Sequence, residues 1–273
     1  MKYLYICIIV FLFSGCVRDI PTPQERKTTL ISLTKNDNLT QFEIQTSTFN
    51  IFTLQTNLNN CKDKNINIYV EGDGLSWISR RTISDNPTPI NPLSLKLMNQ
   101  DNSQCKIYMA RPCQYSDSMM CEKKYWTSHR FSQEVINSYN ESLDFIKKEY
   151  KNKSFKLIGY SGGGAVVALL SATRKDIDSF ITVAGNLDIE KWTTMYNLSK
   201  LDGSLNPVDF SKELENIKQF HMIGSDDKII PKDIFLSYFS KFDRKDKISF
   251  ELFKSDHNCC WEEYYKEVLN RGK

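Results

Sequence analysis

The amino-acid sequence predicts an α/β protein with a mostly parallel sheet and helices on both of its faces. After residue 104, short apolar segments typical of strands alternate with longer segments of helical spacing. Before residue 57, two alternating segments follow each other closely, which predicts an antiparallel hairpin at the start of the fold. Parallel strands need long crossover connections, and the intervening helices can supply them.

Each element is predicted from its own pattern. Alternating or continuously apolar residues bounded by turn formers predict strands at 42–48, 49–56, 65–70, 105–112, 154–160, 179–185, 217–224 and 247–253. Apolar residues at helical spacing predict helices at 132–150, 163–174, 231–242 and 261–270. Ser132 stands directly before the first of these helices, where its hydroxyl can cap free amides.

Length and charge limit the number of domains and the class of partner. A chain of 273 residues with 40% apolar content can bury one large core, so a single domain over residues 42–273 is expected. Its 36 basic and 33 acidic residues give a net charge of only +3, and no basic run contains interleaved aromatic residues. This composition argues against nucleic acid as a partner.

The first 16 residues predict export. Lys2 is followed by an apolar stretch from Tyr3 to Phe13, which is too short to span a bilayer as a helix. Residues 13–16, Phe-Ser-Gly-Cys, resemble the lipobox of bacterial lipoproteins, which implies acyl chains on Cys16 and a membrane-anchored protein of the cell envelope. An ordinary cleaved signal peptide is the alternative. Residues 17–41 are then expected to form a tether.

The segment Gly159-Tyr160-Ser161-Gly162-Gly163 fits the pattern G-x-S-x-G between a predicted strand and a predicted helix. In that position the pattern forms a tight turn that lifts the serine hydroxyl above the strand ends. The amide N–H of Gly162, at the helix start, is then free to bind an oxyanion. A phosphate-binding loop is disfavoured because no Lys-Ser or Lys-Thr pair follows the glycines, and a plain packing turn is the remaining alternative.

Two carboxylates and a histidine, which are candidates for a triad acid and base, follow this serine in the chain. Asp226 and Asp227 come after the strand at 217–224, and His257 comes after the next strand. A serine nucleophile needs a base to take its proton, and the base needs a carboxylate to orient it. The order Ser161, Asp227, His257 is that of the α/β-hydrolases.

On these motifs, residues 42–270 resemble the α/β-hydrolase superfamily. The resemblance implies that Ser161 is a nucleophile and His257 its base. In the segment Gly224 to Pro231 it selects Asp227 as the triad acid, with Asp226 as the alternative. It also implies that the backbone N–H of Asp73 is the second oxyanion donor beside that of Gly162, although residues 71–74 could be a plain glycine-rich turn.

Asp73 is an unusual residue for this position. A carboxylate close to a developing oxyanion would oppose catalysis, because like charges in a dry site repel strongly. Its side chain is therefore expected to point away or to pair with a cation, for which the candidates are Arg80, Arg81 and Arg111.

Six cysteines remain after residue 16, and an even number in an exported chain predicts disulfides. The resemblance places the strands that follow Cys61 and Cys105 side by side, which implies a bond between these two. For the other four, all three pairings stay open, including one that joins the neighbours Cys259 and Cys260. That set is Cys113, Cys121, Cys259 and Cys260.

Together these observations predict an exported serine hydrolase that cleaves a carboxylic ester or amide without a metal or organic cofactor. Aromatic residues that follow strand ends, among them Trp126 and Trp192, are candidates for the walls of a substrate pocket. The alternative from another class is a noncatalytic surface lipoprotein that uses the hydrolase fold as a binding module.

Overall fold

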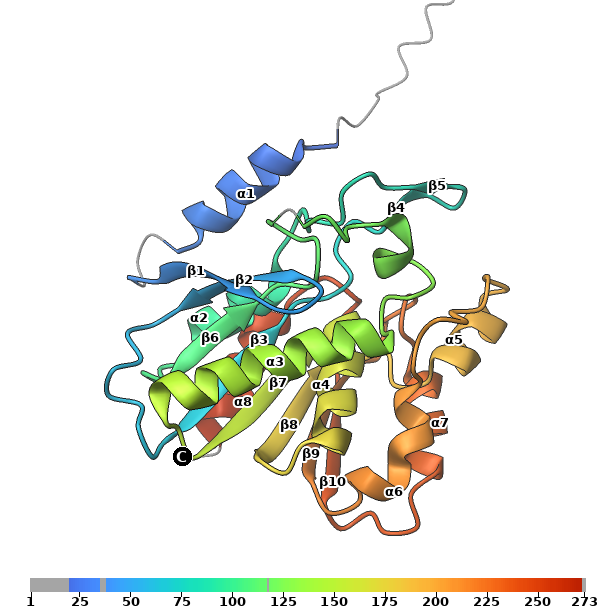
Figure 1. Ribbon diagram of the computed structural model, residues 1–273. Helices are drawn as coiled ribbons and strands as arrows, with labels where there is room; N and C mark the ends of the chain where they lie inside the picture. The colour runs from blue at the N-terminus through green and yellow to red at the C-terminus, as the bar shows by residue number, and fades with distance from the viewer. Residues whose placement is uncertain (1–19, 35–37, 117, 272–273) are drawn as a thin grey trace, which may run out of the picture.

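The computed structural model describes residues 20–34, 38–116 and 118–271. The predicted signal peptide and Cys16 lie outside these residues. Figure 1 shows a twisted central sheet with helices packed on both of its faces. No helix in the described ranges is long and apolar enough to cross a membrane.

Eight strands form the sheet, in the order β1-β2-β6-β3-β7-β8-β9-β10. β1 pairs antiparallel with β2, and β2 pairs antiparallel with β6. From β6 to β10 in this order, all neighbouring strands pair parallel. The predicted fold class is therefore confirmed, including the antiparallel hairpin at the start. The bounds are β1 Thr40–Gln45, β2 Asn50–Gln55, β3 Asn65–Val70, β6 Lys106–Met109, β7 Ser154–Tyr160, β8 Ile177–Val183, β9 Lys218–Gly224 and β10 Ile248–Phe253.

Side chains alternate between two apolar layers, as strand geometry requires. In β3, Ile68 and Val70 face one layer and Tyr69 faces the other. The first layer is completed by α3 (Gln133–Tyr150), α4 (Gly162–Thr173), α6 (Ser211–Leu214) and α7 (Lys232–Ser240). The second is completed by α1 (Pro23–Ser32), α2 (Leu93–Gln100) and α8 (Trp261–Arg271). Shorter segments are α5 (Ile189–Met195) and 3₁₀ turns at Lys123–Trp126 and Pro207–Phe210.

Part of the segment expected to be a tether is helical. Thr22 and Glu25 form a reciprocal capping box at the start of α1, with Pro23 at the first helical position. One turn apart on the same face, Arg26 and Leu30 are both buried, and the Arg26 guanidinium donates hydrogen bonds to the carbonyl oxygens of Asn86 and Thr88. This helix is therefore packed on the domain rather than extended away from it.

The predicted helix at 132–150 is confirmed, but its expected cap is not formed. α3 begins after Ser132, whose buried hydroxyl has no hydrogen-bond partner among the described residues. An unpredicted two-stranded hairpin, β4 (Trp77–Ser79) with β5 (Thr82–Ile83), projects from the body of the domain (Figure 1).

The structure pairs all six cysteines expected to form disulfides. Cys61 bonds to Cys105 at the amino-terminal ends of β3 and β6, as the resemblance implied. Of the three arrangements left open for the other four, the structure has Cys113 with Cys121 and Cys259 with Cys260.

Replacing Cys61 and Cys105 together by serine should lower the free energy of unfolding. This disulfide joins residues 44 positions apart, and closing a loop of that length restricts the unfolded chain by about 4 kcal/mol in the entropic model. The Cys113–Cys121 loop spans only 8 positions, so its double serine variant is the matched control with a loss of about 2.5 kcal/mol. Urea unfolding of both variants measures the difference, and equal losses would contradict the expectation.

Candidate active site

Ser161 occupies a strained turn between β7 and α4. Its backbone has φ 52° and ψ −117°, outside the regions that L-residues normally adopt. Three hydrogen bonds hold this conformation: the Ser161 N–H donates to the carbonyl of Val183, and the Ser161 carbonyl accepts from the N–H groups of Gly164 and Asn186. Such strain costs about 1–3 kcal/mol and persists only where the surroundings enforce it.

The two glycines at the ends of the motif allow the close approach that the turn requires. A Cβ on Gly159 would lie 2.2 Å from the carbonyl oxygen of Gly163, and a Cβ on Gly163 would lie 2.3 Å from that of Val70. Both contacts are with backbone, which cannot move aside. The tight turn expected from the G-x-S-x-G pattern is therefore present, and it leaves no room for a side chain at either position.

His257 and Asp227 meet Ser161 at the carboxyl-terminal edge of the sheet. The Nε2 atom of His257 is 3.0 Å from the Ser161 Oγ, and its Nδ1 atom is 2.8 Å from Asp227 Oδ2. Asp227 is buried, and its other oxygen accepts from the N–H groups of Ile229 and Ile230 at 2.8 Å each. These bonds fix the carboxylate so that His257 carries its proton on Nδ1 and presents Nε2 to the serine.

Two aromatic side chains fix the loop of His257 through hydrogen bonds to its backbone. The Tyr160 hydroxyl and the Trp261 indole N–H both donate to the His257 carbonyl oxygen, at 2.9 and 3.0 Å. Tyr160 is the residue before Ser161, so the same turn positions both partners. Asp226, the alternative acid, is exposed and does not contact His257.

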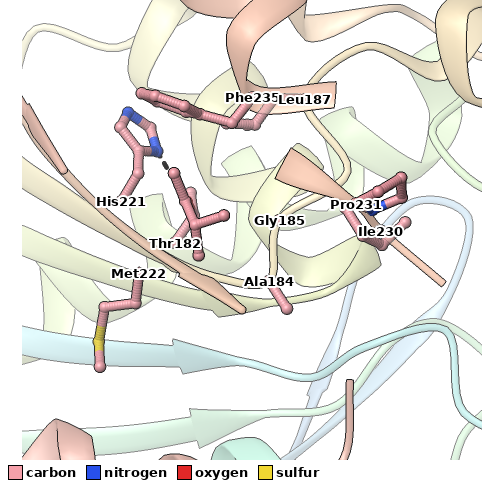
Figure 2. A pocket seen from close by; sticks show the side chains of 10 residues that line it. Thr182, Ala184, Gly185, Leu187, His221, Met222, Ile230, Pro231 and Phe235 are labelled. Carbon is pink, nitrogen blue, oxygen red and sulfur yellow. Dashed lines mark hydrogen bonds between the residues drawn. The ribbon is translucent and has the colours of Figure 1, made fainter. Parts of the chain in front are cut away.

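The other two histidines lie elsewhere. His221 is buried on β9, where its ring contacts Thr182 Oγ1 and Gln219 Oε1 at 2.7 and 3.2 Å. Figure 2 shows it beside a cavity of about 10 Å³, which has room for about one water molecule and none for a substrate. Burial lowers the pKa of His221 to about 3, so its ring is neutral. His129 contacts the neighbouring Ser128 hydroxyl on a separate loop.

The two residues expected to supply oxyanion donors, Gly162 and Asp73, both lie near Ser161. Gly162 is the first residue of α4, so its N–H has no acceptor within the helix. Asp73 follows β3 and lines the same pocket as Ser161. The Asp73 carboxylate lies over Gly162, because a Cβ on that glycine would be 2.0 Å from Asp73 Oδ1.

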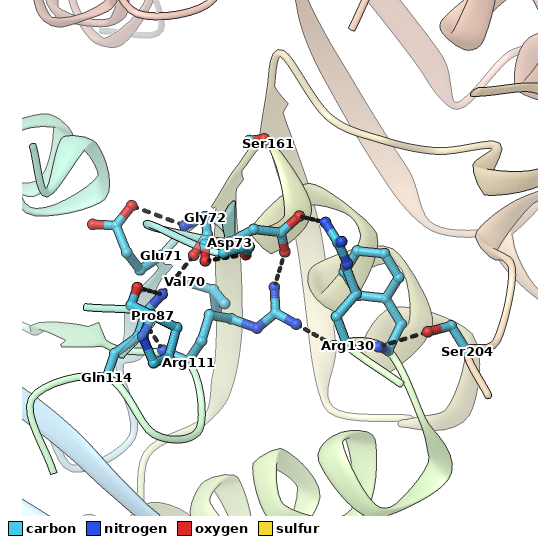
Figure 3. Close-up of polar contacts among 12 residues, drawn as sticks. Val70, Glu71, Gly72, Asp73, Pro87, Arg111, Gln114, Arg130, Ser161 and Ser204 are labelled. Carbon is cyan, nitrogen blue, oxygen red and sulfur yellow. Dashed lines mark hydrogen bonds and ion pairs between the residues drawn. The ribbon is translucent and has the colours of Figure 1, made fainter. Parts of the chain in front are cut away.

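The Asp73 carboxylate is paired with two arginines, as Figure 3 shows. Arg111 contacts Oδ1 at 3.0 Å and Arg130 contacts Oδ2 at 2.6 Å. Burial alone would raise the pKa of Asp73, but the charges of Arg130 and Arg111 outweigh it and lower the pKa below its ordinary value. The expected pairing thus holds for Arg111, and Arg130 is a second partner that sequence reasoning missed. Arg80 and Arg81 lie on the β4–β5 hairpin instead.

Glu71, two residues earlier, is a second buried carboxyl group at this edge. Its oxygens accept from the N–H groups of Gly72 and Ser94 and from the Tyr108 hydroxyl. Burial raises the pKa of Glu71 to about 7, and among the described residues no basic side chain contacts it to oppose this effect. Its protonation therefore changes near neutral pH. No sequence pattern distinguishes this glutamate from a surface residue of the turn.

Ser161, His257 and Asp73 line a pocket of about 530 Å³. Its polar wall includes Ser161, His257, Arg130 and Asn186, and Asn186 is buried with its Oδ1 atom unpartnered. The apolar wall is formed by Trp77, Ile90, Trp192 and Ile229. Trp192 was a sequence candidate for this wall, whereas Trp126 is buried away from it with its indole N–H bound to the Ser84 carbonyl. Within the described ranges, no cluster of histidine, cysteine and acidic residues could hold a metal ion.

A family model described as serine hydrolase (FSH1) matches residues 82–259, which is more than half of the chain. That range contains Ser161, Asp227 and His257 but not Asp73. No curated protein sequence matches the chain.

Solved structures with a similar fold include esterase Pf2001 of Pyrococcus furiosus, which is 14% identical, with 93% of this chain and 94% of that chain covered and a TM-score of 0.58. Est1E from Butyrivibrio proteoclasticus is also 14% identical, with 85% and 96% covered and a TM-score of 0.59. An α/β serine hydrolase homologue from Coxiella burnetii is 12% identical, with the same coverages and a TM-score of 0.60. At these identities the likeness shows a shared fold.

Replacing Glu71 by Gln should remove a pH-dependent loss of stability. The pKa of Glu71 is higher in the folded chain, near 7, than its ordinary value of 4.5, so between these pH values the folded state binds the extra proton. The contribution of Glu71 to the free energy of unfolding is therefore complete below pH 4.5. It is lost as the pH rises to 7, by about 3 kcal/mol in total. Urea unfolding from pH 4.5 to 8 should show this loss in the wild type relative to Glu71→Gln. Parallel curves for the two proteins would contradict the assignment.

Proposed function

The chain belongs to the serine hydrolase (FSH1) family, and on that premise we propose that it cleaves a carboxylic ester or amide through Ser161, His257 and Asp227. The observation that carries the proposal is the continuous hydrogen-bonded path from Ser161 Oγ to His257 at 3.0 Å and from His257 to Asp227 at 2.8 Å. Family membership favours an enzyme over the noncatalytic binding module.

Each residue of the path has one task. Ser161 Oγ attacks the substrate carbonyl carbon while its proton passes to His257 Nε2. Asp227 stabilises the imidazolium, and two backbone N–H groups that bind its second oxygen hold it in place. His257 then gives the proton to the leaving group, which departs as an alcohol or amine. Water attacks the acyl-serine by the same route, releases the acid and restores the enzyme.

The oxyanion of the tetrahedral intermediate is bound by the N–H groups of Gly162 and Asp73 in this proposal. A negative carboxylate over Gly162 would oppose that charge if it were unpaired. Arg111 and Arg130 neutralise it, so Asp73 can supply its backbone N–H without a repulsive side chain.

The family implies small ester or amide substrates, and the pocket is consistent with this size. One of the similar structures, Pf2001 of Pyrococcus furiosus, is titled an esterase, so an ester is the first substrate class to test. The aromatic and aliphatic wall formed by Trp77, Ile90 and Trp192 favours an apolar acyl or alcohol group.

We further propose that the enzyme is exported and held in the cell envelope by acyl chains on Cys16. The lipobox-like residues 13–16 and the apolar stretch before them support this proposal. Disulfide pairing of all six later cysteines is consistent with an oxidising compartment.

A fluorophosphonate probe should label the wild type and fail to label Ser161→Ala. Asp227→Asn should keep the fold but lower kcat on p-nitrophenyl esters by about 10⁴-fold, because the imidazole loses its orientation and the stabilising charge. Asp226→Asn is the matched control and should keep wild-type activity, since that side chain is exposed and apart from His257. Labelling of Ser161→Ala, or a folded wild type that the probe leaves unlabelled, would refute the proposal.

The role of the arginines is tested by a double-mutant cycle. Arg130→Met keeps much of the buried stem but leaves Asp73 with one cation, so kcat should fall by about tenfold as the carboxylate repels the oxyanion. Adding Asp73→Asn removes that negative charge and should restore part of the loss. If the losses in kcat of the single variants Arg130→Met and Asp73→Asn simply add in the double variant, the arginine acts by another route.

A further inference from the structure

We propose that the β4–β5 hairpin and the apolar rim of the pocket dock on an anionic lipid surface, so that the pocket opens against a membrane. The proposed function assigns an anchor at Cys16 but no contact between the folded domain and lipid. The docking rests on the proposed function for its activity readout and on the proposed Cys16 anchor for its placement, and its binding readout is independent of catalysis.

Large apolar side chains gather around the mouth of the pocket. Trp77 and Ile78 on the hairpin are 42% and 48% exposed, and Ile90 and Ile229 are 44% and 50% exposed. Three of them, Trp77, Ile90 and Ile229, line the pocket that contains Ser161. A single exposed apolar residue is ordinary, but several around one opening mark a surface that contacts something apolar.

The same hairpin has a positive tip. Arg80 and Arg81 are exposed in its turn, and neither guanidinium has an acidic partner among the described residues. The nearby acid Asp85 is already paired with Lys123 at 2.7 Å. A tryptophan and an isoleucine beside these two arginines form a short membrane-interface motif, because the apolar side chains enter the headgroup region while the arginines bind lipid phosphates.

The N-terminal helix places the hairpin close to the predicted anchor. Through Arg26, α1 is bonded to Asn86 and Thr88, in the loop that runs from β5 to Ile90 at the pocket rim. Figure 1 shows α1 and the hairpin on the same side of the sheet body. Cys16 precedes the α1 cap Thr22 by six residues, which span at most about 21 Å even when extended. A lipid on Cys16 would therefore bring the hairpin to the same membrane.

A lipid surface fits this patch better than a second protein. A stable protein interface buries about 800 Å² on each side, with a packed apolar centre. The hairpin and rim offer four large apolar side chains and two arginines, which form a mixed patch without a packed apolar centre. This mixed character matches an interfacial membrane contact.

The binding test uses Trp77 as its reporter. The full chain is reconstituted in vesicles of phosphatidylcholine with anionic phosphatidylglycerol, with or without bromine on the acyl chains. Bromolipid should quench wild-type fluorescence, and Trp77→Phe should lose most of that quenching, since Trp126 and Trp261 are buried and Trp192 is half-buried with its indole N–H bonded to the Ile229 carbonyl. Equal quenching in the two proteins, or none in the wild type, would overturn the proposal.

The activity test compares an ester dissolved in the vesicles with a soluble short-chain ester. Arg80→Glu with Arg81→Glu should lower turnover of the vesicle ester by about tenfold or more and leave the soluble ester unaffected. Lys62→Glu with Lys64→Glu makes the same charge change before β3, at the opposite end of the sheet, and should alter neither rate. An equal loss in both pairs would overturn the proposal. A wild type inactive on both esters would refute the proposed function, while quenching would still decide the docking.

Discussion

The structure around the candidate site depends on one packing constraint, the close approach of the Ser161 turn to the neighbouring strand. Gly163 lies against the carbonyl of Val70 at the end of β3, and Gly159 lies against Gly163, so the turn cannot relax. Because of this contact, the serine hydroxyl stands above the sheet and the first N–H of α4 stays free. It also brings the Asp73 carboxylate, in the loop after β3, against Gly162.

A consequence of that approach is a buried carboxylate beside the candidate oxyanion site. Burying an unpaired charge is unfavourable, and two arginines from the segment after β6 offset it. Arg130 also lies over the ring of Trp192, so the ion cluster contacts the wall of the pocket. The electrostatics of the site and the shape of its pocket are therefore set by the same side chains.

Local patterns predicted most of the fold and the core of the site. The alternation in residues 42–56 and the G-x-S-x-G turn rest on neighbours in sequence, and the order Ser161, Asp227, His257 rests on a resemblance in chain order, so these signals are readable without coordinates. The capping box at Thr22 and Glu25 was equally readable and would have predicted α1. The hairpin at 77–83 gave a weaker signal, since its strands are short and its turn lacks glycine.

By itself, the sequence determined the order of the elements and the tight turn at Ser161, because these depend on local backbone chemistry, and the resemblance in chain order predicted which three side chains meet there. Only the tertiary structure decided that Arg130 joins Arg111 on Asp73, that Glu71 is buried enough to titrate near pH 7, and that Cys113 pairs with Cys121 rather than with Cys259 or Cys260. Each of these depends on the distance between segments remote in the chain or on the exclusion of water, and neither quantity is encoded in any short stretch of residues.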